Sequence, residues 1–147
     1  PFNHTGPGQR PGFFVPDMVS QIVALESSDK DELSVGNLSA VRDFSDVRDV
    51  VRAYQLVLES NLERGQVYNI CSGRGVVMQE VLDQLLAMAN KSIRVVVDQS
   101  RIRPSDTPVF VGNHDKLTQD TGWKPEIKLE NTLEESLAHW RLSNLKK

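Results

Sequence analysis

Two short apolar runs constrain the fold of this chain most strongly, because both are typical of buried strands in a parallel sheet. The first, at residues 1–3, leads into a loop of Gly, Pro and hydrogen-bonding side chains that suits the rim of a sheet. The second, at residues 67–71, lies between Gly65 and Gly73 and is apolar or aromatic except at Asn69. Buried parallel strands need neighbours. We therefore expect an α/β protein in which these two strands complete a larger sheet.

Helical patterns separate the predicted strands. Pro16 suits a first-turn position and apolar residues repeat at four-residue spacing, which predicts a helix from Pro16 to about Ser27. A second helix, capped by Ser45 or Asp46, is predicted to end near Asn61. Further helices are predicted at about 78–90, 115–122 and 129–144, and a further strand at 93–97.

Two loops carry more specific predictions. A hairpin is expected from residues 33–37 and 40–44, with its turn near 36–39. The run Ser-Gly-Arg-Gly at 72–75 follows a predicted strand and precedes a predicted helix, so its backbone N–H groups could hold an anion. An ordinary glycine turn is the alternative for so short a motif.

Composition allows one soluble domain with a modest core. The chain has 147 residues, of which 39% are hydrophobic and 25% charged, and no apolar run is long enough to span a bilayer. We therefore expect no membrane role and a cytoplasmic location. Seventeen Lys and Arg against 20 Asp and Glu give a net charge of −3, which argues against nucleic-acid binding. Cys71 is the only cysteine, so no internal disulfide can form, and the scattered histidines predict no zinc site.

Five motifs follow one another in a recognisable order. They are Pro-Phe-Asn-His-Thr-Gly-Pro-Gly-Gln at 1–9, Val-Arg-Asp-Phe at 41–44, Val-Tyr-Asn-Ile-Cys-Ser-Gly at 67–73, Arg-Pro-Ser-Asp at 103–106 and Thr-Gly-Trp-Lys-Pro at 121–125. This set resembles the extended short-chain dehydrogenases that act on nucleotide sugars, and it covers nearly the whole chain. The nearest members are the GDP-4-keto-6-deoxy-mannose reductases, followed by the GDP-mannose 4,6-dehydratases. The opening loop favours the reductases.

The resemblance also implies what these 147 residues lack. Family members carry a glycine-rich first turn and a catalytic Tyr-x-x-x-Lys, but Leu58 follows Tyr54 at the lysine position and Ser72 follows Tyr68. We therefore expect residues 1–147 to be the carboxy-terminal substrate lobe, whose strands complete the Rossmann sheet of a missing amino-terminal domain. That domain would bind most of the NADP or NAD. Alone, the chain is predicted to be inactive and to expose apolar edges or pair them with another copy, and a homo-oligomer is expected.

The resemblance assigns the polar contacts of a GDP-linked deoxyhexose to four side chains. Arg42 and Arg103 would bind the diphosphate, because a planar guanidinium pairs with two phosphate oxygens at once. Asp106 would accept hydrogen bonds from ribose hydroxyls, and Asn3 would meet the sugar or phosphate. In the structural alternative, Arg42 lies at a strand edge, and Arg103 forms a local ion pair with Asp106.

Two apolar positions complete the expected site. Val15, between Phe14 and Pro16, would line the base and ribose, although the start of a helix explains it nearly as well. Phe2 would run past the nicotinamide as a cofactor contact, with core packing as an equal alternative. Arg48 is expected on the solvated face of its helix.

The activity implied by the resemblance is reduction of the C4 keto group of GDP-4-keto-6-deoxy-mannose, with hydride from a nicotinamide and a proton from tyrosine. One alternative is part of a GDP-mannose 4,6-dehydratase or a related nucleotide-sugar epimerase. Another is a non-catalytic binding or oligomerisation module. The reading frame immediately before Pro1 would decide between the enzyme and the non-catalytic module, because a Tyr-x-x-x-Lys and a glycine-rich first turn encoded there would favour the enzyme.

Overall fold

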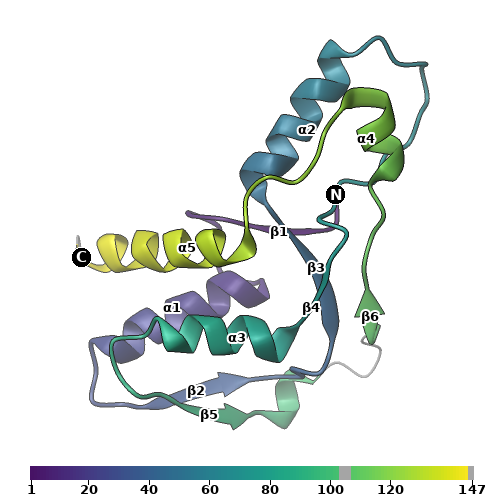
Figure 1. The fold of residues 1–147 in the computed structure, drawn as a ribbon. Helices are drawn as coiled ribbons and strands as arrows, with labels where there is room; N and C mark the ends of the chain where they lie inside the picture. The colour runs from purple at the N-terminus through teal and green to yellow at the C-terminus, as the bar shows by residue number, and fades with distance from the viewer. Residues whose placement is uncertain (103–106, 146–147) are drawn as a thin grey trace.

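The computed structural model describes residues 1–102 and 107–145 (Figure 1). In chain order the elements are β1 (Asn3–Thr5), α1 (Phe14–Glu26), β2 (Glu32–Val35), β3 (Val41–Asp46), α2 (Val47–Glu59), β4 (Gly75–Val77), α3 (Met78–Ala87), β5 (Arg94–Val97), the 3-10 helix η1 (Gln99–Arg101), β6 (Val109–Phe110), α4 (Asp115–Thr121) and α5 (Leu129–Asn144). Helices alternate with short strands, and the predicted α/β class is confirmed.

Strand β3 organises the larger sheet. Its last residues pair in parallel with β1, so that Asn3 lies opposite Phe44. Its first residues pair antiparallel with β4 on one side and parallel with β6 on the other. This sheet therefore brings β1, β4 and β6, which lie far apart in the sequence, together around β3.

The predicted hairpin between residues 33–37 and 40–44 is wrong. Strand β2 pairs in parallel with β5 in a separate two-stranded sheet, while β3 belongs to the larger sheet. The polar stretch at 36–39 therefore connects two sheets instead of turning within one. Apolar side chains explain the choice: Leu33 and Val35 of β2 are fully buried in the core beneath the helices, where a hairpin with β3 would not place them.

The segment 67–71, predicted as a strand that pairs with a missing part of the sheet, has no strand partner among the described residues. Ile70 and Cys71 are buried, as expected, but no ladder forms along this segment. Within the described residues, one backbone–backbone hydrogen bond reaches it, from Phe2 N–H to Ile70 C=O at 2.8 Å. A strand requires a repeating ladder with a neighbour, so pairing of this segment with a strand outside these residues stays a prediction.

Four of the five helix predictions are confirmed closely. Asp46 caps α2, and its carboxylate accepts from Arg48 N–H. Helix α4 ends at Gly122, whose φ of 75° is the left-handed conformation that glycine adopts most easily. Helix α5 spans the predicted residues, whereas α1 begins at Phe14, two residues earlier than predicted. Helix α3 ends at Ala87, earlier than the predicted Asn90.

The buried apolar residues form two separate cores. Figure 1 shows α1, α3 and α5 gathered over β2 and β5 at one end, with α2 and α4 at the other. The larger core contains Val15, Met18, Val19, Ile22, Val23 and Leu25 of α1, Leu33 and Val35 of β2, Val81, Leu82 and Leu85 of α3, and Leu133 and Leu137 of α5. The smaller core contains Val50 and Ala53 of α2, Ile70, Leu117 of α4 and Trp123. Strand β3 runs between the two.

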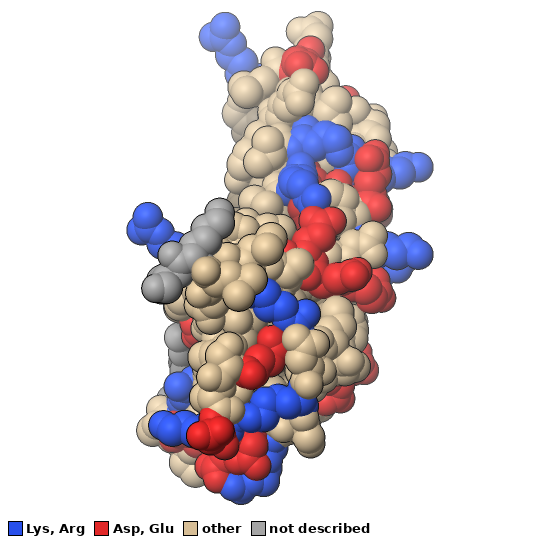
Figure 2. Space-filling model, turned by 90° about the vertical axis from the view of Figure 1, so that its left-hand side faces the viewer, with Lys and Arg blue, Asp and Glu red and all other residues tan. Residues whose placement is uncertain are grey.

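Charge on the surface is mixed. Figure 2 shows basic and acidic side chains interspersed on one face, without a continuous basic area. None of the helices in the described ranges is both long and apolar enough to cross a bilayer.

Candidate functional site

A hollow of about 320 Å³ opens where β1, the start of α1 and β3 meet. We call it the β1–α1 hollow. The residues that line it are Phe2, Asn3, His4, Thr5, Gln9, Phe13, Phe14, Val15, Pro16, Arg42, Phe44 and Met78. Its volume lies within the range of small-molecule sites, which is roughly 300–1,000 Å³.

Four of the predicted site residues meet in this hollow: Phe2, Asn3, Val15 and Arg42. The parallel pairing of β1 with β3 explains why, since it places Asn3 opposite Phe44, two residues after Arg42. Side chains two apart on a strand share a face, so Arg42 and Phe44 point to the same side of β3. The other two predicted residues, Arg103 and Asp106, lie outside the described residues.

The opening loop is shaped by its own polar side chains. Thr5 Oγ1 donates to Gln9 Oε1 at 2.8 Å, and Gln9 Nε2 donates to the carbonyl of His4 at 3.2 Å. Gly12 has a φ of 112°, and its N–H donates to Asp17 Oδ1 at 2.7 Å. These contacts turn the chain back after β1, so that α1 begins beside the strand. The block of turn-forming residues thus builds one wall of the hollow.

The electrostatic character of the hollow is set by Arg42. None of its described lining residues is Asp or Glu, and several of them are apolar or aromatic. An arginine beside aromatic side chains suits a ligand that joins an anionic group to a planar ring.

Arg42 is not at a strand edge, so that structural alternative is wrong. In the sheet it lies opposite Val76 of β4 on one side and Phe110 of β6 on the other. Its Nη1 donates to the carbonyls of Val41 at 2.9 Å and Thr107 at 2.7 Å. These bonds fix the guanidinium beside the hollow.

The apolar predicted residues have structural contacts as well. Val15 is buried in the larger core while lining the hollow. The ring of Phe2 stacks on Phe110, with centroids 4.6 Å apart and planes 24° from parallel. Val15 and Phe2 therefore pack in the structure and also line the hollow, while their contacts to base, ribose and nicotinamide stay predictions.

Sequence reasoning missed other parts of the hollow. Phe44 could have been found from its two-residue spacing to Arg42 on one strand. Gln9 and Thr5 belong to the recognised opening motif, but their mutual hydrogen bond has no sequence signature. Phe13 lines the hollow and is largely exposed, and Met78 reaches it from the start of α3.

The backbone N–H groups at 72–75 were predicted as a possible site for an external anion, and this is wrong for Ser72 and Gly73. Asp43, which is fully buried, accepts from Ser72 N–H at 2.7 Å, from the Ser72 hydroxyl at 2.6 Å and from Gly73 N–H at 2.9 Å. Gly112 N–H donates to the same carboxylate at 3.2 Å. The anion at these amides is the protein's own.

Cys71 is a buried, free thiol. The thiol is buried, and this burial together with the nearby Asp43 carboxylate raises its pKa to about 11. It is therefore protonated near neutral pH and a poor nucleophile.

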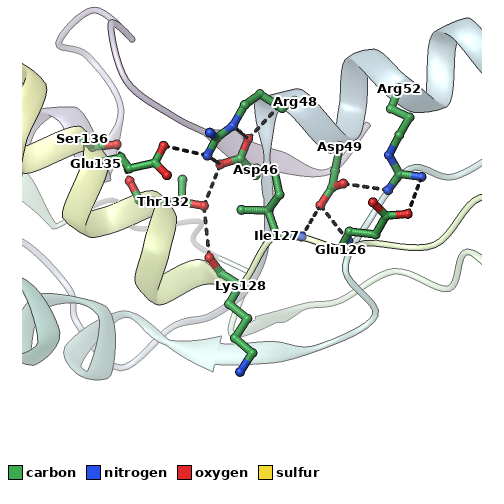
Figure 3. Close-up of polar contacts among 10 residues, drawn as sticks. All are labelled: Asp46, Arg48, Asp49, Arg52, Glu126, Ile127, Lys128, Thr132, Glu135 and Ser136. Carbon is green, nitrogen blue, oxygen red and sulfur yellow. Dashed lines mark hydrogen bonds and ion pairs between the residues drawn. The ribbon is translucent and has the colours of Figure 1, made fainter.

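Arg48 is exposed, as expected, and it also connects α2 to α5 (Figure 3). Its guanidinium binds Asp46 through two hydrogen bonds at 2.9 and 2.8 Å and also meets Glu135 at 2.8 Å. Burial alone would raise the pKa of Asp46, but the bonds from Arg48 and the Thr132 hydroxyl outweigh it, and the pKa is lowered.

Asp49 fixes the segment between α4 and α5 (Figure 3). One carboxylate oxygen accepts from the N–H groups of Glu126 at 3.0 Å and Ile127 at 2.9 Å. The other accepts from Arg52 at 2.7 Å, and the Asp49 carbonyl accepts from the Trp123 indole at 2.9 Å. This segment borders a second hollow of about 950 Å³. Ser72, Gly73 and Arg74 line it, but none of the described residues predicted to contact the nucleotide sugar or cofactor does. Within the described ranges, no three His, Cys, Asp or Glu side chains are placed to hold a metal ion.

Comparison with known proteins identifies relatives over nearly the whole chain. Residues 1–136 match the family model for GDP-mannose 4,6 dehydratase. The chain is 38% identical to GDP-6-deoxy-D-mannose reductase of Pseudomonas aeruginosa over 95% of its own length and 46% of that protein. It is 32% identical to GDP-6-deoxy-D-talose 4-dehydrogenase of Aggregatibacter actinomycetemcomitans over 83% of its length and 40% of that protein.

The fold agrees with these sequence matches. The solved structure of RMD from Pseudomonas aeruginosa complexed with NADPH superposes with a TM-score of 0.87 at 34% identity, covering 96% of this chain and 46% of that one. The chain thus spans less than half the length of these relatives.

Proposed function

Since the chain belongs to the GDP-mannose 4,6-dehydratase family, we propose that it forms the carboxy-terminal substrate-binding part of an NAD(P)-dependent nucleotide-sugar oxidoreductase. The proposed reaction is reduction of the C4 keto group of GDP-4-keto-6-deoxy-mannose. The similarity to a GDP-6-deoxy-D-mannose reductase supports this choice. The observation that carries the proposal is the meeting of Asn3, Val15 and Arg42 in a hollow whose described lining contains no carboxylate.

Each lining residue has a role in this proposal. Arg42 neutralises the diphosphate, and Asn3 donates to or accepts from the sugar or phosphate. Val15 and the neighbouring aromatic rings cover the base and ribose. Arg103 is proposed as the second diphosphate cation, and Asp106 as the acceptor for ribose hydroxyls. Together these contacts would hold C4 of the sugar at the hydride donor, where orientation lowers the barrier.

The hydride would come from a bound nicotinamide cofactor, NADP or NAD. Phe2 is the proposed cofactor contact of this chain: it lines the hollow, and its ring is held by the stack on Phe110. The rest of the cofactor site, with the tyrosine and lysine that handle the proton, is proposed to lie in an amino-terminal Rossmann domain.

Exposed apolar residues support docking of such a domain. Val67 is 79% exposed and Val109 is 59% exposed, and both lie near the segments that approach Phe2. The segment 67–71 forms one backbone–backbone bond within the described residues, so most of its N–H and C=O groups are available for a further strand. We also propose that the whole protein is a homo-oligomer.

The second candidate is a GDP-mannose 4,6-dehydratase, and the match of residues 1–136 to that family model favours it. The two activities differ in substrate. A reductase consumes NADPH with the 4-keto sugar, whereas a dehydratase converts GDP-mannose without net consumption of the cofactor.

Calorimetry of GDP binding to the intact protein tests the proposed site. Replacing Arg42 or Arg103 by Ala should weaken GDP binding by roughly tenfold or more, since each removes a charge-assisted phosphate contact. Arg64→Ala, at an exposed position outside the hollow, is the control and should leave affinity unchanged. Equal GDP affinity in wild type and Arg42→Ala would remove the assigned role.

A second test uses the 147-residue chain alone. We expect no reduction of the 4-keto sugar with NADPH, because neither Tyr-x-x-x-Lys nor the glycine-rich turn is present in this sequence. Measurable turnover would overturn the proposal that the catalytic tyrosine and lysine lie in a separate amino-terminal domain.

A further inference from the structure

We propose that Asp43 is a positioning residue of the β1–α1 hollow, acting through Arg42 and Phe2 rather than on the ligand. Asp43 does not line the hollow, and the inference rests on the function proposed above. Its carboxylate joins β3 to two loops that come from distant parts of the chain. We infer that these loops determine the positions of Arg42 and Phe2, which line the hollow.

The carboxylate is placed as a junction. Asp43 is fully buried and accepts four hydrogen bonds, from Ser72 N–H, the Ser72 hydroxyl, Gly73 N–H and Gly112 N–H, at 2.6 to 3.2 Å. Three of the donors are backbone groups in irregular segments, where no strand or helix would satisfy them. Asp43 therefore determines the distance of both loops from β3.

A chain of contacts leads from Gly112 to the hollow. Gly112 follows β6, whose Phe110 stacks on the Phe2 ring that lines the hollow. The same segment begins with Thr107, whose carbonyl accepts from Arg42 Nη1 at 2.7 Å. Asp43 thus holds one end of the segment that orients both Arg42 and Phe2. Moving Gly112 away from β3 would loosen both contacts.

Close packing leaves little room for adjustment. A Cβ atom added to Gly112 would lie 2.6 Å from Cys71 Sγ and 2.8 Å from the Phe2 ring. Only glycine at 112 therefore lets the loop pack this closely against Cys71 and Phe2, and the bond to Asp43 holds it at that position. A shift of this loop would be transmitted directly to Phe2.

The junction requires a carboxylate. An ionised Asp has only acceptor sites and can serve all four donors, whereas Asn presents an NH₂ group on one side. In Asp43→Asn the NH₂ group would face Ser72 N–H if it took the Oδ1 place, or Gly73 and Gly112 N–H if it took the Oδ2 place, so at least one of these loop segments must move. The substitution keeps the size of the side chain and changes the hydrogen bonding.

The test compares Asp43→Asn with Asp49→Asn in the intact protein. Asp49 is a matched control: it is 2% exposed, it also accepts from two backbone N–H groups of a loop, and it does not line the β1–α1 hollow. GDP affinity is measured by calorimetry, and KM and kcat with the 4-keto sugar and NADPH.

For Asp43→Asn we expect KM and the GDP dissociation constant to rise roughly tenfold while kcat stays within about threefold. For Asp49→Asn we expect both constants within about twofold of wild type, with faster hydrogen exchange around residues 126–127. A purely structural role for Asp43 would lower the folded fraction, which reduces apparent kcat and the number of binding sites but leaves KM and affinity unchanged. That result, or the same KM in both variants, would overturn the inference.

If Asp43→Asn does not fold, Ser72→Ala provides a second test, because it keeps the carboxylate and removes the hydroxyl that donates to it at 2.6 Å. The same hydroxyl also accepts from Arg74 N–H at 3.1 Å, and that local contact is lost as well. We expect a rise of roughly threefold in KM and in the GDP dissociation constant, and unchanged values would overturn the inference. Failure of the proposed function looks different: wild type itself would then bind no GDP, which would refute both proposals before any variant is compared.

Discussion

The larger core, around α1, α3 and α5, consists of aliphatic and Met side chains, whereas the smaller core has Trp123 at its centre and a buried carboxylate, Asp49, beside it. In the larger core, three helices lie against each other and against β2. In the smaller core, α2 and the short helix α4 enclose Trp123, and the segment that follows has no regular structure.

This contrast shows two ways of stabilising backbone. Helices satisfy their own N–H and C=O groups, so α1, α3 and α5 need only apolar faces to pack. The irregular segments at 72–73, 112 and 126–127 cannot do so, and buried Asp43 and Asp49 accept hydrogen bonds from their N–H groups. Buried carboxylates thus satisfy the N–H groups of these irregular segments, as helical hydrogen bonds satisfy those of α1, α3 and α5.

The largest effect is expected for Trp123→Ala. Loss of the buried ring and of its bond to the Asp49 carbonyl should cost about 3–5 kcal/mol of local stability. Hydrogen exchange should accelerate in α2 and α4 and remain slow in α1, α3 and α5. Leu82→Ala is the control from the larger core and should give the opposite pattern. Uniform acceleration in Trp123→Ala would show that the two cores unfold as one.

Asp49→Asn should have the next largest effect. The amide cannot accept from Glu126 and Ile127 N–H while also accepting from Arg52, so we expect a loss of about 1–3 kcal/mol. The amides of residues 126 and 127 should lose exchange protection first. Asp29→Asn, at an exposed position after α1, is the control and should change nothing. Unchanged protection at 126–127 would mean that this segment is held by other contacts.

The same contrast explains how much of the fold the sequence predicted. Periodic apolar residues predicted the five helices, and a cap or a C-terminal glycine marked α2 and α4 well. Strand pairing was not predictable in this way, because β2 and β5 are joined by contacts between residues far apart in the chain. The hairpin was predicted from local turn chemistry, and burial of Leu33 and Val35 decided against it.

For the candidate site, the sequence motifs predicted which side chains bind the ligand but not which residues surround those side chains in the fold. Asn3, Val15 and Arg42 were named from the sequence, and the β1–β3 pairing brings them to one hollow. Asp43 was not singled out, although it stands beside Arg42 in the same motif. Its role depends on hydrogen bonds from the loops at 72–73 and 112. No local sequence pattern shows that these loops lie close to Asp43 in the fold.

Acidification should weaken the contacts between helices by a smaller amount. The bonds from Arg141 lower the pKa of Glu26, and the pKa of Asp46 is also lowered. A carboxyl group with a lowered pKa in the folded state stabilises the protein fully at neutral pH, and this contribution is lost as the pH falls through that value. We therefore expect unfolding free energy to decrease progressively below about pH 5. Glu26→Gln should flatten part of this dependence, and an unchanged slope would contradict the assignment.

The smallest effect is expected at the outer part of the Arg48 contacts. Glu135 and Arg48 are 45% and 48% exposed, so their ion pair is screened by solvent, whereas Asp46 beside them is buried. We expect Glu135→Gln to change stability by less than about 1 kcal/mol. Thr132→Val, which removes the buried hydroxyl donor to Asp46 at 2.7 Å, should cost more. Thermal denaturation of both variants at low and high salt measures the difference. If Glu135→Gln were the more damaging change, attraction between exposed charges, and not buried hydrogen bonding, would hold α5 to α2.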